Sequence, residues 1–160
     1  MERIASFTVD HCKLLPGVYV SRVDYTGGEA VTTFDIRMTR PNVEEPMKTG
    51  TIHAMEHLGA TWLRNQEGIK DKVIYFGPMG CRTGFYFILA GTYVSSDIIW
   101  ILKEMYDFIK DYAEETVPGA TAVECGNYRD MDLEDAKAYA ARFREAVLEG
   151  IGEDRLNYPV

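Results

Sequence analysis

Two early segments of the chain, at 17–25 and 30–38, are rich in Val, Tyr, Thr, Phe and Ile. They are separated by the run Thr26-Gly27-Gly28-Glu29, which suits a tight reversal of the chain. β-Branched and aromatic residues on both sides of such a run are typical of paired strands. The pattern therefore predicts a β-hairpin.

The next hydrophobic pattern has a helical period. After a proline-containing loop at 41–46, a helix is expected to run to about Glu67. Either Thr49 or Thr51 is suited to cap its first turn, because a hydroxyl oxygen can accept from a free backbone N–H.

Short apolar runs at 72–76 and 83–93 predict two more strands. In the longer run both faces are apolar, one carrying Phe85, Phe87 and Leu89 and the other Tyr86, Ile88 and Ala90. A strand that is apolar on both faces is expected in the middle of a sheet.

Two amphipathic helices follow. Ser96 and Asp97 are expected to open the first, which ends near Glu115, and the second is expected over 132–148 after a loop at 118–127. Strands in meander order, with helices between and after them, predict an α+β fold with a mostly antiparallel sheet packed with helices. The 160 residues fit a single domain over the whole chain.

Composition narrows the function. The chain has 17 Lys and Arg against 25 Asp and Glu, a net charge of −8, without a basic run. This excludes a surface built for nucleic acid or for an anionic membrane. No apolar run has the length of a signal peptide or of a membrane span, and three cysteines do not form a disulfide framework. A reducing cytoplasm is the expected location.

The segment 51–59 contains an H-x-x-E-H pattern made by His53, Glu56 and His57. On a helix the two histidines lie one turn apart on the same face, so both imidazoles can reach one metal ion. The glutamate lies at the flank of that face, where it can move protons beside the metal. The alternative is a pair of structural histidines, but these are two of only three histidines in the chain.

A third ligand must come from elsewhere in the sequence. Cys125 is favoured, because two imidazoles and a thiolate form an open site suited to borderline divalent metals. Glu124 is the alternative ligand, as expected for a metallopeptidase of the H-x-x-E-H type. A closed, non-enzymatic metal site would need a fourth ligand such as His11.

Cys81 lies in a glycine-containing turn between two predicted strands. Such a turn can present a reactive group, although an inert thiol is equally compatible with the sequence. Arg37 ends a predicted strand, where it can bind an anionic group or simply be solvated.

Several blocks together resemble the S-ribosylhomocysteine lyase family, over almost the whole chain and in the same order. The blocks are Ser6-Phe7-x-x-Asp10-His11, Phe34-Asp35-Ile36-Arg37-x-x-x-Pro41-Asn42, Thr51-Ile52-His53-x-x-Glu56-His57-Leu58, Pro78-Met79-Gly80-Cys81-x-Thr83-Gly84-x-Tyr86 and Cys125-Gly126. One position departs from the pattern: Tyr75 stands where members often carry an acidic residue.

The resemblance implies a cytoplasmic homodimer that makes the precursor of a quorum-sensing autoinducer. The reaction would convert S-ribosylhomocysteine to homocysteine and dihydroxypentanedione by carbonyl migration and β-elimination. By similarity a divalent metal is held by His53, His57 and Cys125, ferrous iron in the family, with Zn2+ or Co2+ as substitutes. Glu56 and Cys81 would be the acid/base pair. Residues Ser6, His11 and Arg37 would contact the substrate, at a site on the dimer interface.

Overall fold

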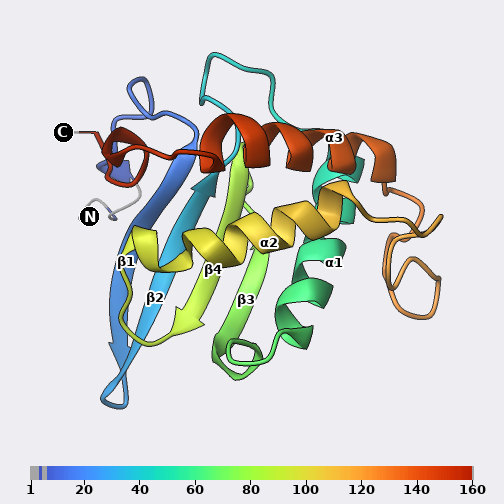
Figure 1. Cartoon of the computed structure of the whole chain (residues 1–160), viewed down its shortest axis with the longest axis horizontal. Helices are drawn as coiled ribbons and strands as arrows, with labels where there is room; N and C mark the ends of the chain where they lie inside the picture. Colours follow the sequence, from blue (N-terminus) through green and yellow to red (C-terminus); the bar gives the residue numbers. More distant parts are fainter. Residues whose placement is uncertain (1–3, 5–6, 160) are drawn as a thin grey trace.

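The computed structural model describes residue 4 and residues 7–159. One sheet is formed by β1 (Gly17–Thr26), β2 (Glu29–Arg37), β3 (Val73–Pro78) and β4 (Gly84–Ala90). The α-helices are α1 (Thr49–Asn65), α2 (Ile99–Lys110) and α3 (Leu133–Phe143). Figure 1 shows α2 and α3 lying across one face of the sheet, with α1 beside β3. The α+β prediction is confirmed. Within the described residues no helix is both long and apolar enough to cross a membrane.

The predicted hairpin is formed by β1 and β2, which pair antiparallel and end at the facing residues Thr26 and Glu29. Gly27 and Gly28 both have positive φ values, 60° and 90°. A two-residue turn of this kind requires left-handed backbone at both central positions, and glycine adopts it without steric cost.

The strand order is β1-β2-β4-β3, so the expected meander order is wrong, although every pairing is antiparallel. Because β2 and β3 are both antiparallel to β4, they run parallel to each other. Parallel strands cannot be joined by a tight turn and need a crossover connection, which here is α1. The last strand, β4, then fills the central position that its two apolar faces predict. Phe85 and Phe87 on it are completely buried.

Helix α1 begins where expected but is not capped as expected. The N-cap residue is Lys48, and its side chain makes no capping hydrogen bond. The two threonines point elsewhere: the Thr49 hydroxyl donates to Asp130 (3.3 Å) and that of Thr51 to Asp135 (2.5 Å). The predicted cap is wrong because these hydroxyls tie the start of α1 to the first turn of α3 and to the segment before it.

The helix predicted to end near Glu115 is shorter than expected, whereas the one predicted over 132–148 is helical to Leu148. A short 3-10 turn, η3 (Ser95–Ile98), precedes α2, and the Asp97 carboxylate accepts from the N–H of Val94 (2.8 Å). After Lys110 the N–H of Tyr112 donates to the carbonyl of Ile109 (3.3 Å), a tightened bond that closes the helix.

The Asp132 side chain caps α3 by accepting from the N–H of Asp135 (3.0 Å), as its position before the helix allows. The helix then continues as the π-turn η4 (Arg144–Leu148). The short 3-10 turns η2 (Lys70–Lys72) and η5 (Glu153–Arg155) complete the elements.

Close packing of α1 on β3 fixes the position of the histidine-bearing helix. A methyl group on Gly59 would lie 2.5 Å from Cε1 of Phe76, whose ring stacks on Phe85 with centroids 5.0 Å apart. The absence of a side chain at Gly59 therefore sets how close the helix comes to the sheet.

Overpacking usually costs about 1–3 kcal/mol, whereas alanine is the better helix former by roughly 1 kcal/mol. Because the added methyl would contact a fixed ring, we expect Gly59→Ala to lower the free energy of unfolding by ~1–2 kcal/mol in total. Denaturant unfolding measures the change. Gly80→Ala is the control, since no atom lies within 4 Å of the added methyl. A Gly59→Ala protein as stable as the parent would contradict this packing argument.

Candidate active site and metal centre

The two histidines of the H-x-x-E-H pattern lie on the same face of α1. The ring centroids of His53 and His57 are 4.8 Å apart, with an angle of 80° between the ring planes. Both side chains are half-buried. The helix therefore brings two imidazoles within reach of one point in space.

Backbone carbonyls orient both rings. Nδ1 of His53 lies 2.9 Å from the carbonyl oxygen of Asp130, and Nδ1 of His57 lies 2.7 Å from that of Pro118. A carbonyl can only accept, so each Nδ1 carries the proton and each Nε2 keeps its lone pair. This is the arrangement that orients histidine ligands in metal sites.

Cys125 completes the group from the loop before α3. Its Sγ lies 3.3 Å from Nε2 of His53, and the N–H of Asn127 donates to it over 3.5 Å. Among the described residues, His53, His57 and Cys125 are the set whose potential ligand atoms lie together, all within 4.8 Å of one another. Two nitrogens and one sulfur with converging lone pairs fit a divalent metal and leave a coordination position open.

The rival ligands lie elsewhere. The Glu124 carboxylate accepts from the hydroxyl of Thr121 (2.7 Å), and Nδ1 of His11 lies 2.9 Å from the carbonyl oxygen of Val9. Neither residue belongs to the His/His/Cys group. The geometry therefore favours Cys125 over Glu124, and the closed four-ligand site finds no support in His11.

One supporting position was not singled out by the sequence patterns. Gly119 has φ +73°, and a methyl group there would lie 3.2 Å from Nδ1 of His57. A glycine is therefore needed for the loop to place the carbonyl of Pro118 on the imidazole. Backbone carbonyls make these contacts, so the types of side chain in the loop do not predict them.

Glu56 lies next to the metal group. It is half-buried and lines a cavity of about 310 Å3 between α1 and the turn after β3. The lining residues are Thr49, Ile52, His53, Glu56, Pro78, Met79, Gly80, Arg82 and Asp130. The carboxylate and one histidine thus share one space, as the helical spacing predicts.

Cys81 lines a different cavity, of about 250 Å3. It is lined by His11, Arg37, Pro41, Asn42, Glu44, Pro46, Cys81 and Thr83. The turn is held by hydrogen bonds between Arg82 and Met47, and Arg82 itself has left-handed backbone, φ 58°. Three predicted site residues, His11, Arg37 and Cys81, therefore come together here. Ser6 lies outside the described residues.

Polar neighbours favour the thiolate form of Cys81. Desolvation by itself would raise the pKa of this thiol. Hydrogen bonds with Thr83, whose Oγ1 lies 3.1 Å from Sγ, and the positive charge of Arg37 outweigh it and lower the pKa below its ordinary value. This direction favours the reactive over the inert reading of Cys81. The solvated reading of Arg37 is wrong, since this side chain is only 4% exposed.

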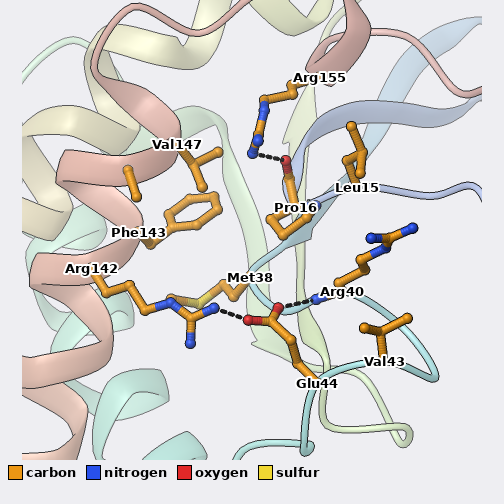
Figure 2. Close-up of a pocket in the computed structure, with 11 residues that line it drawn as sticks. Leu15, Pro16, Met38, Arg40, Val43, Glu44, Arg142, Phe143, Val147 and Arg155 are labelled. Carbon is orange, nitrogen blue, oxygen red and sulfur yellow. Dashed lines mark hydrogen bonds and ion pairs between the residues drawn. The ribbon is translucent and has the colours of Figure 1, made fainter.

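Another cavity, of about 420 Å3, shares only Glu44 with the lining of the Cys81 cavity (Figure 2). Its walls are formed by Leu15, Pro16, Met38, Arg40, Val43, Glu44, Arg142, Phe143, Ala146, Val147 and Arg155. Glu44 forms an ion pair with Arg142 there, and Arg155 donates to the carbonyl of Pro16 (2.9 Å). No predicted site residue within the described part of the chain lines it, so cavity volume alone does not locate the chemistry.

Comparison with known proteins agrees with this geometry. The family model described as S-Ribosylhomocysteinase (LuxS) matches residues 4–154. The chain is 59% identical to the S-ribosylhomocysteine lyase of Clostridium acetobutylicum over 159 residues, which cover 99% of each chain. It is 56% identical to the protein of that name from Clostridium beijerinckii and 52% identical to that from Finegoldia magna, with the same coverage. The chain therefore belongs to the S-ribosylhomocysteinase family and is an enzyme, a lyase.

Proposed function

We propose that this protein cleaves S-ribosylhomocysteine to homocysteine and dihydroxypentanedione, the precursor of a quorum-sensing autoinducer, with a divalent metal held by His53, His57 and Cys125. The observation that carries the proposal is the convergence of two imidazoles and a thiol, from distant parts of the sequence, within 4.8 Å of one another. Relatives over 50% identical, named for this lyase activity, support the choice of substrate.

The substrate sets the chemistry that the side chains must supply. The carbon that bears the thioether is not adjacent to the starting carbonyl, so the carbonyl must first move along the ribose chain. Each move takes a proton from one carbon and returns one to its neighbour, and β-elimination then expels the homocysteine thiolate. A bound divalent metal would act as a Lewis acid on the sugar oxygens. The proton transfers require two groups of different kinds.

Cys81 is assigned to the carbon-bound protons. Its lowered pKa makes the thiolate, the basic form, more abundant near neutral pH. Glu56 is assigned to the oxygens and to the leaving sulfur, because its carboxylate shares a cavity with His53 and adjoins His57 in the sequence. Arg37 and His11, which line the Cys81 cavity, are proposed to face the substrate, and we assign the same role to Ser6.

Ferrous iron is the proposed ion. Two imidazoles and one thiolate form a donor set of intermediate softness, which suits divalent metals of the first transition row, iron among them. Zn2+ and Co2+ fit the same donors and are expected to substitute. The three cysteines are free in the structure, which agrees with a cytoplasmic location.

We further propose a homodimer whose two chains share each site. The acid/base candidates line two separate cavities that both include residues of the turn after β3, Glu56 in one and Cys81 in the other. If a second copy places its Cys81 cavity against the His/His/Cys group of the first copy, the Cys81 of one chain and the Glu56 of the other come together in one site. A two-fold dimer forms two such sites at once.

Replacing either proton carrier is expected to stop the reaction without loss of metal. We expect Cys81→Ala and Glu56→Gln to reduce homocysteine release at least about 100-fold, a typical contribution of a positioned acid or base. Release is measured by titrating the thiol produced from S-ribosylhomocysteine, and metal content is measured on the same samples. Near-normal turnover in either variant would refute its assignment.

Sharing of sites between chains predicts complementation. Cys81→Ala and Cys125→Ala, each inactive alone, are dissociated, mixed in equal amounts and reassociated. Half of the dimers are then mixed, and one of their two sites is intact, so about a quarter of the parent activity should return. A mixture of His57→Ala and Cys125→Ala is the control, because every site then lacks a metal ligand. Failure of the first mixture to regain activity would show that Cys81 serves its own chain.

A further inference from the structure

We propose that Tyr158 and Asp35 are positioning residues for Cys81: they hold the Arg37 guanidinium so that one nitrogen faces the thiol. This inference rests on the proposed function only in giving Cys81 a role in the reaction. The contacts that carry it join β2, the turn before β4 and the segment after η5.

The Arg37 guanidinium is shared between two partners. Its Nε and Nη2 donate to the Asp35 carboxylate over 3.1 Å and 2.6 Å. The remaining nitrogen, Nη1, donates to Oγ1 of Thr83 (2.6 Å) and lies 3.7 Å from Sγ of Cys81. A guanidinium is a rigid plane, so gripping one edge fixes the direction of the other nitrogen. Asp35 and Arg37 are two apart on β2 and hence on the same face of the sheet.

Tyr158 fixes the carboxylate in turn. Its hydroxyl donates to Oδ2 of Asp35 over 2.9 Å, from 123 residues away in the chain. Its ring stacks on that of Tyr19, with centroids 4.8 Å apart and an angle of 12° between the planes. Desolvation and the charge of Asp35 raise the pKa of Tyr158 well above its ordinary value, so the phenol keeps its proton and remains a donor.

Asp35 and Arg37 are buried, so each depends on the protein groups that contact it. The exposed fractions of Asp35 and Arg37 are 2% and 4%, which leaves little room for water to take over a lost partner. A buried carboxylate that loses one of its donors keeps its charge with less compensation, because water does not replace the donor.

The charge balance around the thiol gives the direction of the effect. The charged groups around Cys81 include Arg37 on β2 with its partner Asp35, the adjacent Arg82, and Glu44 and, when protonated, His11 in the same cavity; the phenol of Tyr86 on β4 interacts with the thiol. Arg37 favours thiolate and Asp35 opposes it. The Tyr158 hydroxyl donates to the Asp35 carboxylate and so offsets part of its negative charge. Loss of this hydrogen bond should therefore strengthen the repulsion between Asp35 and the sulfur and disfavour the thiolate.

The test compares Tyr158→Phe with Tyr19→Phe. Each variant keeps the ring stack and loses one hydroxyl, but the Tyr19 hydroxyl donates to the carbonyl of Leu15 (2.9 Å) and not to Asp35. The rate of iodoacetamide alkylation at Cys81 is followed against pH by peptide mass spectrometry, together with kcat, KM and thermal unfolding. Cys81→Ala gives the background.

We expect Tyr158→Phe to move the alkylation midpoint to higher pH, to slow alkylation at neutral pH about threefold, and to lower kcat with little change in KM. In Tyr19→Phe, alkylation and kcat should match the parent even if the melting temperature falls. An unchanged midpoint in Tyr158→Phe, or the same shift in both variants, would overturn the inference. The alkylation result does not depend on turnover, so it stands apart from failure of the proposed function, which Cys81→Ala reveals.

Discussion

The candidate site depends on two hydrogen bonds from imidazole Nδ1 atoms to backbone carbonyls. Those bonds, from His53 to Asp130 and from His57 to Pro118, determine which ring nitrogens remain free to bind a metal. They also dock the segments on either side of Cys125 onto α1, so that the sulfur reaches the same point. The helix, the loop and the three candidate ligands are therefore linked, because the same hydrogen bonds orient the rings and hold the loop.

A second constraint governs the Cys81 side of the turn. A buried Asp35–Arg37 ion pair lies beneath the thiol, and it is tolerated there because tyrosine and threonine hydroxyls satisfy its remaining groups. The metal side is built from a helix and irregular loops, whereas the thiol side is built on the sheet. Helix α1 forms the crossover between β2 and β3, and Gly59 lets this helix pack closely on the sheet. The metal side and the thiol side therefore meet at the turn after β3.

Much of this architecture could be predicted from local patterns. The Gly27-Gly28 turn and the two apolar faces of β4 reflect interactions within a few residues, and both predictions are confirmed. The predictions of the strand order and of the α1 cap were wrong because distant contacts decide both features. Helix α1 leads the chain from β2 to β3, which leaves the position between these strands for β4. Thr51 donates to Asp135, 84 residues away, instead of capping its own helix. Local patterns do not carry such pairings.

The site shows the same division. Helical spacing was sufficient to pair His53 with His57, but it left Cys125 and Glu124 as alternatives, which the loop geometry distinguishes. The contacts of the Pro118 and Asp130 carbonyls with the two histidines could not be predicted, because backbone atoms make them. Nor could the contact of Tyr158 with Asp35 be predicted, because it spans nearly the whole chain.

The most direct test of the central claim is the metal K-edge X-ray absorption of the zinc-loaded protein and of Cys125→Ser. We predict a first shell with two imidazole nitrogens at about 2.0–2.1 Å and one sulfur at about 2.3 Å, and loss of the sulfur in the variant. A parent spectrum without sulfur, or a sulfur that persists in Cys125→Ser, would contradict the account.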